Sequence, residues 1–208
     1  MFRRNFLKNS IIGSLSASTI MSLTNKNNPI VKSVPRIIST WKHGVNANKI
    51  AWKKLNNGEG GLTAVEYGVR DSENDPNERS VGYGGLPDRE GKVTLDACIM
   101  DSNNDCGSVS FLENIKNPIS VARLVMEKTP HIMLSGKGAY DFAIENGFKS
   151  ENLLTEQSKK DWENWLKKSE YKPIINIENH DTISMLLIDS DRNLFGACTT
   201  SGAAWKMH

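Results

Sequence analysis

The chain has 208 residues, of which 38% are hydrophobic and 24% charged, a balance typical of a folded globular protein rather than of a disordered, collagen-like or coiled-coil chain. The net charge of +2 is unevenly spread: residues 1–28 hold four basic and no acidic side chains, and the rest holds 22 basic and 24 acidic ones. Without a basic excess to neutralise phosphates, the folded part is not expected to bind nucleic acid.

The first 28 residues are typical of an export signal. They begin with Arg3-Arg4-Asn5-Phe6-Leu7-Lys8 and continue into a mildly apolar, serine-rich run that is too short to span a bilayer. The arginine pair resembles the twin-arginine signal, which exports folded proteins. We therefore expect residues 1–28 to be a twin-arginine-type signal peptide and linker. The protein is then periplasmic or secreted, with no membrane association after export.

The following stretch predicts a strand, two helices and a hairpin. Residues 36–41 are rich in β-formers, and Asn46 is placed to cap a helix over residues 47–55. A second helix is predicted over residues 63–71. Strands over residues 92–100 and 107–112 flank a turn of polar residues, which predicts a hairpin.

The second half of the chain is predicted to contain further helices and strands. Asn117 and Pro118 form an N-cap and N1 pair that starts a helix to residue 128. A strand over residues 132–134 and helices over residues 139–146 and 155–167 follow. Residues 171–179 are predicted to be a linker.

Two strands end the predicted order. The nearly continuous apolar run 183–188 predicts a strand buried on both faces, and residues 194–200 predict its antiparallel partner. This mixture of helices and hairpins indicates an α+β fold.

Several local patterns favour structure over chemistry. The glycine-rich segment 82–85 has no phosphate-loop lysine and indicates a turn. The carboxylates of Asp96 and Asp101 flank a hairpin turn, and Trp162 and Trp165 form a packing stripe. Four histidines lack metal spacing, so neither a metal nor another cofactor is expected.

The three cysteines allow one disulfide at most. They form no CxxC pair and have no zinc spacing. Centring the hairpin turn at residue 103 places Cys98 opposite about residue 108 and Cys106 opposite about residue 100. These two are therefore out of register for a disulfide, and we expect free, mostly buried thiols.

The tripeptide His180-Asp181-Thr182 carries the chemical hypothesis. A polar linker runs here into an apolar strand headed by a threonine. Cleavage of the Asp181–Thr182 peptide would leave Thr182 with both a hydroxyl and a free α-amine, whose pKa is ordinarily about 7.7–8.0. Such an amine can act as the general base for its own hydroxyl. The alternative interpretation of Thr182 is an ordinary first residue of a strand.

Six motifs stand in a fixed order along the chain. They are Ser39-Thr40-Trp41, Ser80-Val81-Gly82-Tyr83-Gly84-Gly85, Leu95-Asp96-Ala97-Cys98-Ile99-Met100-Asp101, Asn117-Pro118-Ile119-Ser120-Val121-Ala122, Asn179-His180-Asp181-Thr182-Ile183 and Gly196-Ala197-Cys198-Thr199-Thr200-Ser201-Gly202. Together they resemble the glycosylasparaginase family, N4-(β-N-acetylglucosaminyl)-L-asparaginase, of the N-terminal nucleophile hydrolases. The resemblance extends from about residue 29 to residue 208.

The resemblance implies a four-layer αββα sandwich that cleaves itself into an α chain, here residues 29–181, and a β chain that begins with residues 182–208. It implies that Thr182 is the catalytic nucleophile, that Asp181 precedes the scissile bond, and that Trp41 and Thr200 contact the substrate region. The implied substrate is a small molecule, glycosylated asparagine, released in glycoprotein degradation, and no cofactor is required. A homodimer of α/β pairs is also implied.

The same family continues beyond residue 208 and there supplies an Arg and an Asp that bind the substrate. We therefore expect the sandwich to be incomplete at the carboxyl terminus and the chain to be inactive without that part. The alternative functions are an L-asparaginase or isoaspartyl peptidase of the same fold, and a non-catalytic truncated remnant that acts as a binding protein.

Overall fold

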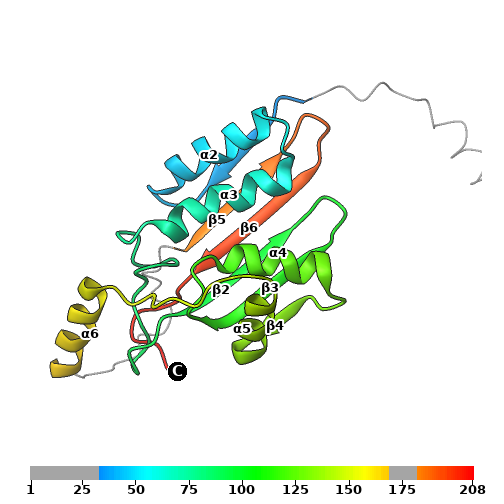
Figure 1. Ribbon diagram of the computed structural model, residues 1–208. Helices are drawn as coiled ribbons and strands as arrows, with labels where there is room; N and C mark the ends of the chain where they lie inside the picture. The colour runs from blue at the N-terminus through cyan, green and yellow to red at the C-terminus, as the bar shows by residue number, and fades with distance from the viewer. Residues whose placement is uncertain (1–32, 169–181) are drawn as a thin grey trace, which may run out of the picture. The chain divides into compact units, whose positions relative to one another are not determined.

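Six strands form one sheet in the order β1-β5-β6-β2-β3-β4 in the computed structural model, which describes residues 33–168 and 182–208 (Figure 1). The strands are β1 (Arg36–Ser39), β2 (Thr94–Met100), β3 (Cys106–Glu113), β4 (Met133–Ser135), β5 (Ile183–Ile188) and β6 (Leu194–Thr200). Neighbouring strands are antiparallel except for β3 and β4. The predicted signal peptide and the predicted linker 171–179 lie outside the described residues.

Four helices cover one face of this sheet. They are α2 (Gly44–Asn56), α3 (Gly61–Asn74), α4 (Pro118–Lys128) and α5 (Gly136–Glu145). The pair α2 and α3 packs on the half of the sheet formed by β1, β5 and β6, and α4 and α5 pack on the half formed by β2, β3 and β4 (Figure 1). One continuous apolar core lies between the helices and the sheet. The packing is close, because a Cβ added to Gly107 of β3 would collide with the Ala122 carbonyl oxygen of α4.

The helix α6 (Glu156–Lys168) packs on loops instead of on the sheet. Its Ser158 hydroxyl donates to the Gly84 carbonyl at 2.6 Å, and the Trp162 indole N–H donates to the Arg89 carbonyl at 3.1 Å. The Trp165 ring stacks on Trp205 with centroids 5.5 Å apart. The predicted packing role of Trp162 and Trp165 is therefore confirmed.

The α+β prediction is confirmed, with a helical layer on a sheet layer as in the first two layers of the implied αββα sandwich. The predicted hairpin register is also confirmed, because Cys98 lies opposite Ser108 and Cys106 opposite Met100. Within the described ranges, no helix is long and apolar enough to cross a membrane.

The predicted burial of β5 on both faces is wrong for the described residues. The strand alternates, with Met185 and Leu187 buried and Leu186 49% exposed, because the described helices cover only one face of the sheet. The cysteines are free thiols, as predicted, but they are not mostly buried: Cys98 is exposed, and Cys106 and Cys198 are half-buried.

Two predicted helix caps differ in detail. The helix α2 begins at Gly44 with His43 at its N-cap, so Asn46 lies inside the first turn and donates to the Asp71 carboxylate instead. At α4, Asn117 is the N-cap but its side chain makes no capping hydrogen bond. That side chain bonds α3, as described below.

Candidate active site

The two threonines that the resemblance singles out meet at one end of the sheet. Thr182 directly precedes β5 and Thr200 is the last residue of β6, and the register pairs Ile183 with Thr199. The antiparallel pairing therefore brings the two hydroxyl groups face to face, and the Thr182 Oγ1 donates a hydrogen bond to the Thr200 Oγ1 at 3.0 Å. Both residues are half-buried.

The Thr200 hydroxyl is held in a defined orientation. Its oxygen accepts from the Gly202 N–H at 2.9 Å, and its own proton points to the Ser80 carbonyl at 3.4 Å. The remaining lone pair of Thr200 is then aimed at the hydroxyl of Thr182. This hydrogen bond fixes the direction of the Thr182 O–H bond.

Thr40 fixes the backbone of the candidate nucleophile. Its hydroxyl donates to the Thr182 carbonyl at 2.8 Å and accepts from the Ser184 N–H at 3.0 Å. The Thr40 N–H donates to the Ser184 carbonyl at 3.0 Å. The segment after β1 therefore clamps the start of β5 from the side opposite β6. Sequence reasoning noted the Ser-Thr-Trp motif but gave Thr40 no role.

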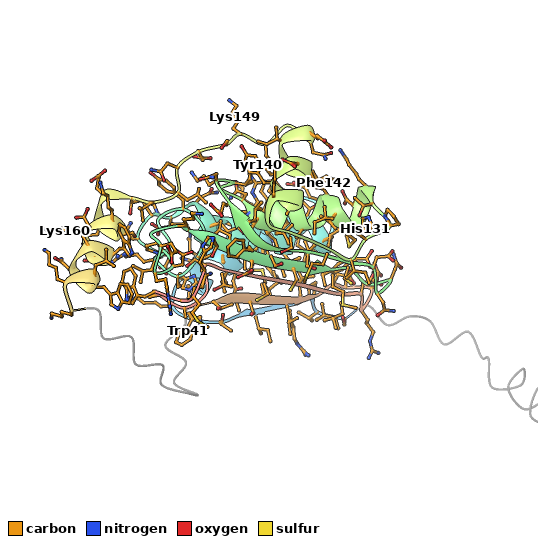
Figure 2. All side chains as sticks on the ribbon, turned by 90° about the horizontal axis from the view of Figure 1, so that it is seen from below. Trp41, His131, Tyr140, Phe142, Lys149 and Lys160 are labelled. Atoms are coloured by element: carbon orange, nitrogen blue, oxygen red, sulfur yellow. The ribbon has the colours of Figure 1, made fainter. Side chains whose placement is uncertain are left out.

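Trp41 lies beside this clamp with an unusual backbone. Its φ angle is +62°, a left-handed conformation that costs a non-glycine residue about 1–3 kcal/mol. Its side chain is 53% exposed and lies at the edge of the molecule away from Tyr140 and Phe142 of α5 (Figure 2). It lines a recess of about 600 Å³.

Most residues that line this recess are polar, and the two threonines are not among them. Its other lining residues are Lys42, His43, Asn46, Asp71, Ser72, Asp75 and Glu78. The structure thus brings Thr182 and Thr200 into contact. Trp41 follows Thr40 in the chain, and Thr40 is the residue that bonds to Thr182. Asp181, the residue predicted to precede the scissile bond, lies outside the described residues.

A buried carboxyl group on α3 binds the residue next to Thr200. Glu73 of α3 is fully buried; its Oε1 accepts from the Thr199 hydroxyl at 2.7 Å and from the Ile119 N–H at 3.1 Å. Its Oε2 accepts from the Asn117 amide at 3.2 Å. Burial raises the pKa of Glu73 to about 8, against the opposing effect of these donors. Glu73 therefore ties α3, the start of α4 and the residue next to Thr200 together.

The glycine-rich segment contributes to the same support. Gly82 has a φ of +59°, and a Cβ at this position would meet the Glu73 backbone carbonyl oxygen. The Tyr83 N–H donates to that carbonyl at 2.8 Å. The segment is a turn, as predicted. Sequence reasoning missed Glu73 itself, because nothing in the spacing distinguishes it from a surface acid.

The other candidate patterns have structural partners. Asp96 accepts from the Phe111 N–H at 3.0 Å, and Asp101 accepts from the N–H groups of Asn103 and Asp105 in the hairpin turn. In residues 33–168 and 182–208, no group of three or more His, Cys, Asp or Glu side chains could hold a metal ion.

Comparisons with known proteins place the chain in one family. A family described as "Asparaginase" matches residues 18–208. The N(4)-(Beta-N-acetylglucosaminyl)-L-asparaginase of Elizabethkingia miricola is 59% identical over 211 residues, covering 99% of this chain and 62% of the relative. The protein of that name from Rattus norvegicus is 34% identical, covering 89% and 61%. A putative one from Drosophila melanogaster is 34% identical, covering 96% and 61%. The chain thus spans about three fifths of the length of these relatives.

Proposed function

The chain belongs to the asparaginase family that matches residues 18–208, and from this premise we propose that it forms part of an N-terminal threonine amidohydrolase of the glycosylasparaginase type. The proposed reaction is hydrolysis of the amide bond between an asparagine side chain and N-acetylglucosamine. The observation that carries the proposal is the 3.0 Å hydrogen bond between Thr182 and Thr200 at the head of β5.

The first proposed step is self-cleavage before Thr182. The Thr182 Oγ1 attacks the carbonyl carbon of Asp181, and the peptide nitrogen leaves as the α-amine, so an ester links the two residues. Water then opens this ester and leaves the Asp181 carboxylate and a free Thr182 hydroxyl. The clamp of Thr40 on the Thr182 carbonyl supports this step, because it limits the rotation of the attacking residue.

The second proposed step is turnover at the exposed amine. The α-amine takes the proton of the Thr182 hydroxyl, and the oxygen attacks the side-chain amide carbonyl of glycosylated asparagine. The glycosylamine leaves, and water releases aspartate from the acyl-enzyme. A positioned general base commonly contributes roughly 10²–10⁴-fold to such a rate. We assign Thr200 the orientation of the nucleophile and Trp41 the shaping of the substrate pocket.

The substrate range can be tested with a chimaera of this chain and the last two fifths of the E. miricola relative, which is 59% identical. We expect release of aspartate from aspartylglucosamine to exceed release from free asparagine and from a β-aspartyl dipeptide. A preference for either of the latter substrates would favour the alternative, an L-asparaginase or isoaspartyl peptidase. No turnover of all three by a cleaved, folded chimaera would contradict the proposed activity.

We also propose that a second sheet packs on the face of the present sheet that the described helices leave uncovered. Leu186 and Met100 on that face are 49% and 42% exposed, and a covering layer would bury them. Separately, we propose from the resemblance that the mature enzyme is a homodimer of α/β pairs. Native mass spectrometry of the chimaera should give twice the mass of one α/β pair, and a single pair would contradict the dimer.

Export by the twin-arginine route is proposed from the sequence alone, on the basis of Arg3-Arg4-Asn5-Phe6-Leu7-Lys8. A reporter fused to residues 1–32 should reach the periplasm. Changing both Arg3 and Arg4 to Lys should leave the reporter in the cytoplasm, and unaffected export would remove the assignment.

A further inference from the structure

Two cysteines from distant parts of the sequence are direct partners in the sheet. Cys98 of β2 lies opposite Cys198 of β6 in the antiparallel register. Flanking pairs in the same register, Asp96 with Thr200 and Met100 with Gly196, show that the pairing continues on both sides of the cysteines. A local distortion is therefore not needed to bring the two residues together.

Both thiols are on the same face of the sheet. Residues directly opposite each other in a sheet point to the same side, and the neighbours Ala97, Ile99, Ala197 and Thr199 are buried toward the helices. Cys98 and Cys198 therefore point to the face that the described helices leave uncovered. The exposure of Cys98 agrees with this orientation.

The spacing of such a pair suits a covalent bond. Cα atoms of opposed antiparallel residues are about 4.5–5.5 Å apart, and disulfides span about 4.4–6.8 Å between Cα atoms. The opposed Cβ atoms are about 4.5–5.5 Å apart, so a small approach brings them to the 3.5–4.5 Å of a disulfide. We propose that Cys98 and Cys198 are an oxidisable pair that forms a cross-strand disulfide.

The surroundings of Cys198 favour the first chemical step. The Ser184 hydroxyl donates to the Cys198 sulfur at 3.3 Å. Hydrogen bonds from the Cys98 thiol and from Ser184 lower the pKa of Cys198 to about 6. The same hydrogen bond, from the Cys98 thiol to Cys198, raises the pKa of Cys98. The hydrogen bond from Ser184 stabilises negative charge on Cys198, so we assign Cys198 the attack on the oxidant.

The oxidation is a thiol–disulfide exchange with a small disulfide such as oxidised glutathione. The Cys198 thiolate attacks one sulfur of the oxidant, and one glutathione thiolate leaves. Cys98 then loses its proton and attacks the Cys198 sulfur, and the second glutathione thiolate leaves. Two protein thiols and one external disulfide give one protein disulfide and two external thiols, with two electrons transferred.

The third cysteine provides a matched control within the same sheet. Cys106 of β3 lies opposite Met100, two residues along from Ser108, the partner of Cys98. Cys98 and Cys106 are thus diagonal neighbours, for which the Cα separation is about 7–8 Å and exceeds the disulfide range. Cys106 should therefore stay reduced under conditions that join the other two.

The position of the pair relates it to the candidate active site. Cys198 is two residues before Thr200 in β6, and Ser184 is two residues after Thr182. The cysteine pair therefore occupies the next row of side chains from the two threonines on the same face. Its disulfide would fasten β6 to β2 beside this row. The inference does not depend on the proposed hydrolase activity. Because the proposed second sheet would cover this face, the inference applies to the chain while the face is open, as in the described residues.

The test is a thiol count on the purified full chain before and after incubation with oxidised glutathione. After denaturation, iodoacetamide should label three cysteines in the reduced chain and one in the oxidised chain, with the label on Cys106. Peptide mapping without reductant should give one linked pair of peptides, which contain Cys98 and Cys198. In Cys106→Ser the count should fall from two to zero.

Two further variants complete the design. Cys98→Ser should stop at a mixed disulfide of Cys198 with glutathione and keep one reactive thiol, on Cys106. Cys198→Ser should form no internal disulfide and keep two reactive thiols once the excess oxidant is removed. The wild-type and Cys106→Ser counts carry the test even where these variants fold poorly. Three labelled cysteines in the oxidised wild type, stable glutathione adducts without an internal bond, or a linkage that includes Cys106 would overturn the proposal.

Discussion

The two faces of strand β5 differ in burial. On the helix-covered face, Met185 and Leu187 are at most 1% exposed. On the other face, Ser184 is half-buried and Leu186 is 49% exposed. The covered face carries only packing roles along this strand. The uncovered face carries the reactive groups: the threonine pair in one row of side chains and the cysteine pair in the next. A single strand thus serves stability with one set of alternate residues and chemistry with the other.

Thr182→Ala in the chimaera tests the reactive groups of the uncovered face and should have the largest effect. Removing the only nucleophile of the proposed mechanism should abolish self-cleavage and lower turnover by about 10⁴-fold or more. Ser184→Ala, on the same strand and face, is the matched control and should keep both. Thr182→Ser should retain part of both. An active Thr182→Ala protein would place the chemistry elsewhere.

The two faces should also differ in their contribution to stability. Met185→Ala removes a fully buried side chain that packs against Gly68 of α3, and it should lower the free energy of unfolding by about 2–5 kcal/mol. Leu186→Ala is the neighbouring control and should cost this chain about 1 kcal/mol or less, because the side chain is already half-exposed. Urea unfolding followed by circular dichroism measures both. Equal losses would show that the two faces are equally packed.

On the helix-covered side of the sheet, the buried carboxyl group of Glu73 should make the free energy of unfolding depend on pH. Folding raises its pKa from 4.5 to about 8, so between these values the folded chain keeps a proton that the unfolded chain loses. The contribution of this group to stability is therefore complete below about pH 4.5 and is lost as the pH rises toward 8. Glu73→Gln does not titrate and keeps an oxygen acceptor for Thr199 and Ile119.

The Glu73→Gln variant should consequently gain stability relative to the wild type between pH 5 and pH 8, by roughly 2–4 kcal/mol. Unfolding free energies of the two proteins at several pH values measure the difference. Parallel pH profiles would mean that Glu73 is ionised in the folded chain at all these values.

Apart from the control variants, Trp41→Ala should give the smallest effect. Its side chain is half-exposed and lies outside the hydrogen bonds of the threonine pair. Trp41→Ala in the chimaera should therefore permit cleavage before Thr182 and lower kcat/KM by roughly tenfold, equivalent to about 1.4 kcal/mol. Trp41→Phe should recover part of the loss. Failure of Trp41→Ala to cleave would make Trp41 part of the processing machinery.

Local signals in the sequence predicted most elements of the fold. The Asn117-Pro118 pair marked the start of α4 within one residue, and the polar turn 101–105 gave the register of β2 and β3. Such signals depend on residues adjacent in the chain. The alternation of β5 was missed because the sequence run is apolar throughout, and only the placement of the helices on one face separates buried from exposed positions.

The candidate site could be predicted only in part. Thr182 and Thr200 were identified from motifs, and the sheet brings their hydroxyl groups into contact. The support by Thr40 and Glu73 depends on contacts across 142 and 126 residues of sequence, which no local pattern encodes. The pairing of Cys98 with Cys198 was missed for the same reason, because β2 and β6 are neighbours only in the folded sheet.

The central claim concerns one peptide bond, and the amino terminus of the β fragment tests it most directly. The chimaera, incubated after purification and resolved by intact-mass and amino-terminal analysis, should yield two fragments, one ending at Asp181 and one beginning with Thr182 as a free amine. Thr182→Ala should yield a single uncut polypeptide. A fragment that begins at any other residue, or cleavage of the Thr182→Ala protein, would contradict the account.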